Sequence, residues 1–94
     1  MKLRWQSQFK RALKKQVKLH PDVLDEVQAV LAQLEQDPFV PNLRTHKLQG
    51  QMAGQWSCSV AYDLRIIFTF VPDLDDPKEQ AIALLNLGKH DEVY

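Results

Sequence analysis

The spacing of apolar residues changes near residue 45, and this change constrains the fold more than any other feature of the sequence. Before it, apolar residues recur every three or four positions, which is the period of an amphipathic helix. After it, they alternate with small or polar residues or form runs rich in β-branched side chains, which is typical of strands. A chain of 94 residues has room for one modest core. We therefore expect a single α+β domain over residues 1–94.

Two helices are predicted in the first half. Ser7 is a suitable cap for the first helix. Pro21 is expected to open the second, because the N–H that proline lacks has no partner in a first helical turn. Pro38 disfavours helix in the preceding residue, so the second helix should end near Asp37. The two apolar stripes consist of Phe9, Leu13 and Val17, and of Val23, Val27, Val30, Leu31 and Leu34. An antiparallel helical hairpin that covers one face of a sheet is the expected arrangement.

Strands are predicted at the N-terminus and throughout the second half. Leu3 and Trp5 alternate with polar residues and indicate a short first strand. Residues 56–62 alternate, residues 65–71 are rich in β-branched and aromatic side chains, and residues 81–87 are apolar. Residues 72–77 form an acidic turn between the last two strands. Helices gathered on one side of a mainly antiparallel sheet make an α+β domain.

The charge of the chain is balanced in total but uneven along the sequence. Twelve basic residues offset twelve acidic ones, yet residues 1–20 hold seven lysines and arginines and no acid. The ordinary interpretation of such a run is a solvated helix face. The alternative is a surface that binds phosphates while acidic residues elsewhere cancel the sum. The residues expected to bind RNA in that case are Lys10, Arg11, Lys14, Lys15, Lys18 and Lys47.

Composition excludes several other classes of protein. No segment approaches the roughly 20 apolar residues that cross a bilayer, and no apolar run follows the basic N-terminus as in a secretory signal. The lone Cys58 fits a reducing cytoplasm, and its apolar neighbours predict a buried strand position and not a nucleophile. The three histidines lack metal-ligand spacing, and no glycine-rich phosphate loop is present. We therefore expect a cytoplasmic protein that uses neither metal nor cofactor.

Titratable side chains gather where the predicted strands begin or end. His90 and Tyr94 follow the last strand, His46 opens the strand region, and Asp63 and Arg65 stand at the start of a core strand. Cleavage of RNA by its own 2′-hydroxyl needs a base, an acid and positive charge at the phosphate. Histidine suits acid or base work, and arginine grips two phosphate oxygens. The set therefore suits phosphodiester chemistry on RNA.

Each of these residues also has a simpler interpretation. Asp63 shapes a turn first of all, and Arg65 is in a position for a surface salt bridge. His46 is as readily an exposed histidine as a functional one, and terminal residues such as Tyr94 usually fray. Val93 is expected to pin Tyr94 to the body of the protein. His20, Trp5 and Trp56 are expected to be structural.

Four segments, taken together in this order and spacing, resemble one known group of proteins. They are THKLQG (45–50), MAGQWSCSV (52–60), YDLRIIF (62–68) and GKHDEVY (88–94). With them, nearly the whole chain resembles the RelE/ParE superfamily of bacterial toxins, most closely the YafQ-like branch of mRNA interferases. The resemblance implies a RelE-like fold and a ribosome-dependent endoribonuclease that cuts mRNA at the decoding site. It also implies a cognate antitoxin, and we expect the toxin alone to be monomeric.

The resemblance also assigns roles by position. His46 and Asp63 match functional residues of the YafQ-like branch, and Arg65 matches the phosphate-binding arginine of RelE-like members. His90 falls where YafQ-like members have a catalytic histidine, and Tyr94 matches a terminal functional aromatic residue. Ser59 departs from the pattern, because YafQ-like members carry another histidine there, so this chain is expected to rely more on His46, His90 and Arg65. The basic first helix would contact ribosomal RNA.

Two other functions remain open at this point. A toxin of the same fold that poisons DNA gyrase, as ParE-like members do, would signal DNA damage without cleaving mRNA; the two histidines argue against it. An inactive relative that only binds an antitoxin would be harmless when produced without its partner.

Overall fold

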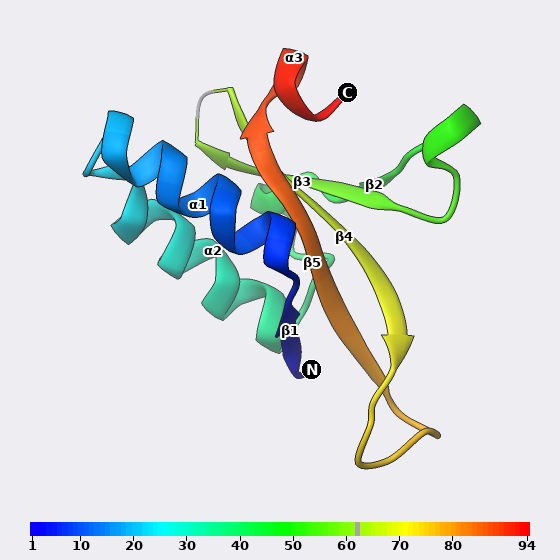
Figure 1. The fold of residues 1–94 in the computed structure, drawn as a ribbon. Coiled ribbons are helices and arrows are strands. Elements are labelled where there is room, and N and C mark those ends of the chain that lie inside the picture. Colours follow the sequence, from blue (N-terminus) through cyan, green and yellow to red (C-terminus); the bar gives the residue numbers. More distant parts are fainter. Residues whose placement is uncertain (62) are drawn as a thin grey trace.

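The computed structural model describes residues 1–61 and 63–94 and places a five-stranded sheet beside a helical hairpin (Figure 1). The elements are β1 (Leu3–Trp5), α1 (Ser7–Leu19), α2 (Val23–Gln36), β2 (His46–Lys47), β3 (Trp56–Ala61), β4 (Leu64–Pro72), β5 (Gln80–Lys89) and α3 (His90–Val93). Short 3-10 helices at Pro41–Leu43 and Gly50–Met52 flank β2. The strand order is β1-β5-β4-β3-β2, with β1 parallel to β5 and the other pairs antiparallel. The predicted α+β fold is confirmed.

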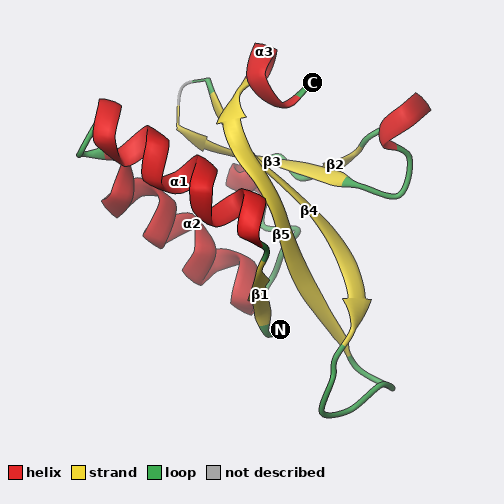
Figure 2. Cartoon of the chain, viewed as in Figure 1, coloured by secondary structure: helices red, strands yellow, loops and turns green. Residues whose placement is uncertain are grey.

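The core lies between the helical hairpin and one face of the sheet (Figure 2). Phe9 of α1 and Leu34 of α2 are fully buried against strand residues such as Ile66 and Phe68 of β4. Burial of each such side chain contributes roughly 1.5–3 kcal/mol to folding. Ile82 and Leu84 of β5 complete this layer. The apolar stripes that the sequence predicts therefore do face the sheet.

Helix α2 starts later than predicted and ends where predicted. The N–H of Val23 donates to the carbonyl of His20 at 3.0 Å, and that of Leu24 donates to Pro21 at 3.3 Å. These bonds close a tight turn across residues 20–22, so Pro21 belongs to the turn and the helix begins at Val23. The helix ends at Gln36, where Asp37 adopts an extended conformation ahead of Pro38, as predicted.

A bulge in β5 decides which residues face the open side of the sheet. Ile67 of β4 pairs with Asn86 and Phe68 pairs with Leu84, so Leu85 is the extra residue. Because of this insertion, both Leu84 and Leu87 face the core, whereas Asn86 and Gly88 face the opposite side. The strand is also longer than the predicted 81–87, since it runs from Gln80 to Lys89. Tyr62, predicted to end the strand over residues 56–62, lies outside the described residues.

Candidate functional site

The candidate site lies on the face of the sheet that is turned away from the helices. On this face, side chains form rows that run across the strands. Directly paired residues of adjacent strands lie on the same face. His46 of β2 pairs with Ser57 of β3, Ser57 pairs with Ile67 of β4, and Ile67 pairs with Asn86 of β5. We call these four residues the central row. The next row consists of Ser59, Arg65 and Gly88.

The C-terminal helix α3 is attached firmly to the body. Val93 is buried, and the Glu92 carboxylate accepts hydrogen bonds from the Lys89 N–H at 2.8 Å and from the Gln16 side chain at 3.0 Å. The Lys15 ammonium lies 3.4 Å from the same carboxylate. The Lys89 N–H, followed by Lys15 and Gln16, holds the pKa of Glu92 below its usual range despite partial desolvation. The expectation that Val93 pins the tail is confirmed.

Tyr94 connects α3 to the central row. Its hydroxyl hydrogen-bonds to the Oγ of the fully buried Ser57. The ring of His90 packs edge-on against the ring of Tyr94, with centroids 4.6 Å apart and planes at 68°. The His90 side chain is otherwise 62% exposed, with its Nδ1 3.6 Å from the Asp91 carboxylate. Tyr94 thus contacts both His90 and Ser57, the strand residue that pairs with His46.

His46 is exposed, and one of its ring nitrogens is held by the backbone. Its Nδ1 lies 3.0 Å from the carbonyl oxygen of Arg44, a residue with a left-handed φ of 52°. Because a carbonyl oxygen only accepts, Nδ1 carries the hydrogen in this arrangement. When the imidazole is neutral, its Nε2 therefore has a free lone pair, as a general base requires.

Arg65 stands one row away from Ser57 and is half-buried. Its Nη1 donates to the carbonyl of Leu64 at 3.2 Å, which restrains the guanidinium. Its partners on the two neighbouring strands, Ser59 and Gly88, have small side chains, which leave room over this part of the sheet. A restrained guanidinium in an open position suits a phosphate group. Ser59, where the resemblance expects a histidine, thus lies on the same face as His46.

Two predicted site residues, Asp63 and Lys47, do not lie with the central row on the open face of the sheet. Asp63 is exposed in the β3–β4 turn and lines a separate hollow of about 480 Å³ at the helical side, with Gln16 and His20. Lys47 follows His46 along β2 and faces the opposite side of the sheet, with its Nζ 5.5 Å from the ring centre of Trp56. Strand alternation explains why Lys47 and its neighbour His46 face opposite sides of the sheet.

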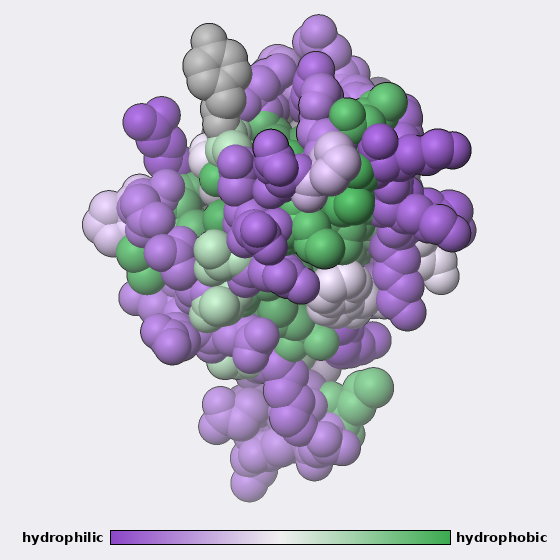
Figure 3. All heavy atoms as spheres, turned by 90° about the vertical axis from the view of Figure 1, so that its left-hand side faces the viewer, coloured by the Kyte–Doolittle hydropathy of each residue, from purple (hydrophilic) through white to green (hydrophobic). Residues whose placement is uncertain are grey.

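The predicted RNA-binding residues of α1 are all exposed. Figure 3, which shows the side of the molecule with the two helices, has hydrophilic side chains over most of the surface. Lys15 is the member that reaches α3, through Glu92. The exposed residues are Lys10, Arg11, Lys14, Lys15 and Lys18.

Ser57 is the central residue that the sequence does not single out as functional. Alternation places it on the side of the strand opposite Trp56 and Cys58, but nothing in the sequence indicates its hydrogen bond to Tyr94. The signal that identifies Ser57 is its full burial on the face of the strand that points away from the core. Burial is a tertiary property, so the sequence alone does not show it.

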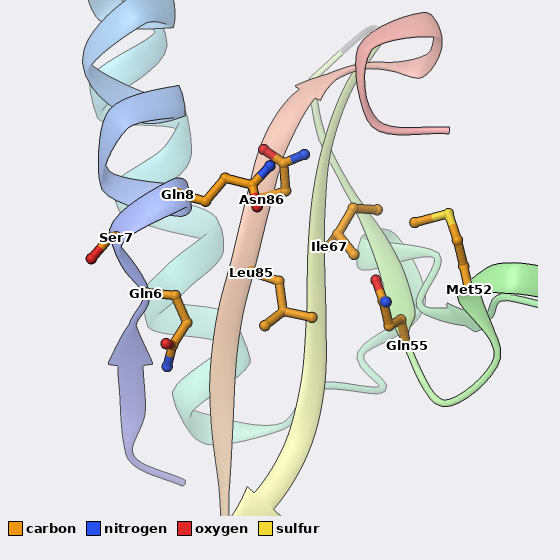
Figure 4. A pocket seen from close by; sticks show the side chains of 8 residues that line it. All are labelled: Gln6, Ser7, Gln8, Met52, Gln55, Ile67, Leu85 and Asn86. Carbon is orange, nitrogen blue, oxygen red and sulfur yellow. The ribbon is translucent and has the colours of Figure 1, made fainter.

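A hollow of about 570 Å³ adjoins the central row (Figure 4). It is lined by Gln6, Ser7 and Gln8 at the start of α1, by Met52 and Gln55 ahead of β3, and by Ile67, Leu85 and Asn86 on the sheet. Ile67 and Asn86 belong to both the hollow and the central row.

Three further observations concern expectations drawn from composition. Cys58 is fully buried, and desolvation raises the pKa of its thiol to about 12, as expected for a structural cysteine. Within residues 1–61 and 63–94, no helix combines the length and apolarity needed to cross a bilayer. In the same residues, no three histidine, cysteine or carboxylate side chains form a group that could hold a metal ion.

Solved structures share this fold. YafQ from E. coli strain BL21(DE3) is 18% identical, with a TM-score of 0.78 over 98% of this chain and 96% of that one. A YoeB/ParE toxin from Agrobacterium tumefaciens is 19% identical, with a TM-score of 0.75 over 96% and 99%. The E. coli DinJ–YafQ complex gives 19% identity and a TM-score of 0.67 over 98% and 96%. At these identities the similarity establishes the fold.

Sequence comparison goes further. A search among curated proteins finds no significant match. The model of one family, described as the bacterial toxin of the type II toxin-antitoxin system, YafQ, matches residues 1–94. Because the match spans the whole sequence, the chain belongs to the YafQ family of type II toxin-antitoxin toxins.

Proposed function

We propose that this toxin is an endoribonuclease that cleaves mRNA on the translating ribosome by acid/base chemistry on the RNA itself. The observation that carries the proposal is the gathering of His46, Arg65, His90 and Tyr94 around Ser57 on the open face of the sheet. His46 and Arg65 come from two strands, and His90 and Tyr94 come from the C-terminal helix and the residue after it. Together they match the demands of phosphodiester cleavage.

In the proposed reaction, the 2′-hydroxyl of one nucleotide attacks the adjacent phosphorus and the 5′-oxygen leaves. One imidazole takes the hydroxyl proton and the other supplies a proton to the leaving oxygen. His46 and His90 fill these two roles, in an order that a pH–rate profile of single variants would assign. Arg65 stabilises the charge that develops on the phosphate. The phenol of Tyr94 is engaged with Ser57, so its ring is the part available to stack on a base.

We assign Asp63 no part in this proton path, because it lines a hollow at the helical side together with Gln16 and His20. We propose that Asp63 shapes the turn that precedes Arg65. The exposed basic residues of α1 would contact ribosomal RNA, whose backbone phosphates attract lysine and arginine. The crystal structure of the E. coli DinJ–YafQ complex supports a cognate antitoxin for this toxin as well. A cytoplasmic location follows from a ribosomal target.

The test is primer extension on a message in a reconstituted translation reaction, with and without ribosomes. With the wild type, we expect cuts within codons, and only in the reaction that contains ribosomes. His90→Ala and Arg65→Ala should each lower cleavage by 100-fold or more, since each removes a proton-transfer or charge-stabilising group. His20→Ala, at the exposed α1–α2 turn, and Arg4→Ala, on β1, are matched controls that should keep activity.

Two results would contradict the proposal. Full cleavage by His90→Ala and Arg65→Ala would show that the catalytic groups lie elsewhere. Intact message with the wild type under both conditions would favour a gyrase poison, if expression induces DNA damage signalling, or an inactive antitoxin-binding module, if expression is harmless.

A further inference from the structure

The hollow beside the central row has an unusual lining for a nuclease that handles phosphates. Four carboxamide side chains surround it, and no charged residue contributes to its wall. Ile67 and Leu85 supply apolar surface between them (Figure 4). A carboxamide offers both donors and an acceptor, so this wall can meet a neutral, planar ligand with a polar edge. The four carboxamides are Gln6, Gln8, Gln55 and Asn86.

The carboxamides are available for a ligand. The Oδ1 of Asn86 accepts from the N–H of Leu87 at 2.9 Å, which fixes the side chain and leaves its NH₂ group for other partners. In residues 1–61 and 63–94, the structure gives the side chains of Gln6, Gln8 and Gln55 no hydrogen bond. Figure 4 shows the ends of Gln8 and Asn86 close to one another at one end of the hollow.

The hollow is also at the right distance from the proposed reaction. Ile67, in its wall, pairs with Ser57, and Asn86 pairs with Ile67. Two strand spacings, roughly 10 Å, therefore separate Asn86 from the residue that holds Tyr94. A group seated against Asn86 is thus a close neighbour of a phosphate held by Arg65.

A second hollow extends the first along α1. It has a volume of about 270 Å³, shares Gln8 and Asn86 with the first, and adds Arg11, Lys15 and Glu92 to its wall. The Lys15 ammonium lies 3.4 Å from the Glu92 carboxylate, so Arg11 supplies the net positive charge of this wall. The charged side chains thus begin where the uncharged wall ends. This order suits a nucleotide whose base lies in the first hollow and whose backbone continues past the second.

We propose that the carboxamide-lined hollow binds one nucleobase of the mRNA next to the cleaved bond, and that Gln8 and Asn86 read its edge. The proposal rests on the endoribonuclease function above. A base has apolar faces for Ile67 and Leu85 and an edge of donors and acceptors for the carboxamides, which is how side chains distinguish bases. A phosphate would find no cation in this hollow.

The experiment maps cleavage sites across a pool of messages in the reconstituted translation reaction and scores the base at each codon position. Gln8→Ala and Asn86→Ala should each lower the preference for the favoured base at one position at least threefold. Their total cleavage should fall less than that of Arg65→Ala. Asn86→Asp keeps the shape but loses the donor, so it should shift the preference toward a base that donates at that edge. Gln28→Ala, which removes an exposed carboxamide of α2, is the matched control and should keep the wild-type preference.

The outcomes separate the two proposals. Wild-type cleavage with a base preference that Gln8→Ala, Asn86→Ala and Asn86→Asp all leave unchanged would overturn the base-binding hollow and keep the nuclease. Wild-type cleavage with no base preference at any position would do the same. Absence of cleavage by the wild type would overturn both. Gln8 is exposed on α1, so loss of folding does not obscure its variant.

Discussion

The phenol of Tyr94 hydrogen-bonds to the hydroxyl of Ser57, which is fully buried in β3 on the sheet's open face. The two residues are 37 positions apart in the sequence. Through this bond the ring of Tyr94, and with it His90, is held over the strands that carry His46 and Arg65. The proposed site is therefore assembled by a tail and a strand that share one hydrogen bond.

Removal of the Tyr94 hydroxyl should destabilise the protein more than removal of the Ser57 hydroxyl. Tyr94→Phe leaves the buried Ser57 hydroxyl without its partner, which costs about 1–3 kcal/mol. Ser57→Ala leaves the half-exposed Tyr94 phenol free to bond water, so its cost should be smaller. The double variant should be more stable than Tyr94→Phe alone. Urea unfolding followed by tryptophan fluorescence measures all three, and additive effects would argue against the bond.

A side chain at Gly88 should disturb the position of α3. A Cβ added there would lie 3.1 Å from the Cβ of Glu92 and 3.2 Å from the Cγ1 of Val93, both in α3. Because Val93 is buried, α3 has to give by a few tenths of an ångström, and His90 and Tyr94 move with it. We expect Gly88→Ala to lower mRNA cleavage at least tenfold while the circular dichroism spectrum stays native. Gly54→Ala, with no atom within 4 Å of the added Cβ but a φ of 90°, is a backbone-strain control expected to affect stability more than activity.

The attachment of α3 should weaken in acid. The pKa of Glu92 is lower in the folded protein than in the unfolded chain, mainly because of the Lys89 N–H. The carboxylate therefore contributes stability above its unfolded pKa of about 4.3, and the contribution is lost as the pH falls through the folded pKa. Glu92→Gln should be less stable than wild type at pH 7, and the difference should shrink as the pH falls below the unfolded pKa of the carboxylate. A difference independent of pH between 3 and 7, measured by thermal unfolding, would exclude this role for the charge.

Cys58 should be inert in the folded protein. Desolvation raises the pKa of its thiol to about 12, so almost none is thiolate at pH 8, and the side chain is fully buried. We expect iodoacetamide to label Cys58 at least 100-fold more slowly in buffer than in 6 M guanidinium chloride, as followed by mass spectrometry. Equally fast labelling in buffer would mean that β3 opens readily.

Local patterns determined the elements and most of the fold. Helical spacing on each side of Pro21, strand alternation after residue 45 and the position of Pro38 are properties of neighbouring residues, and they predict the helical hairpin and the sheet. The predicted start of α2 at Pro21 is wrong, because two hydrogen bonds across residues 20–22 favour a turn there.

For the site, the sequence identified candidate residues by their chemistry and their places at strand ends. Only the tertiary structure decided which of them meet. The bulge at Leu85, the pairing of His46 with Ser57 and the return of Tyr94 to Ser57 depend on contacts between distant segments. Local patterns carry no information about such contacts, because each one forms only after the helices and strands have packed around a common core. That is why the sequence singles out Asp63, which lies at the helical side, and passes over Ser57, which bonds to Tyr94.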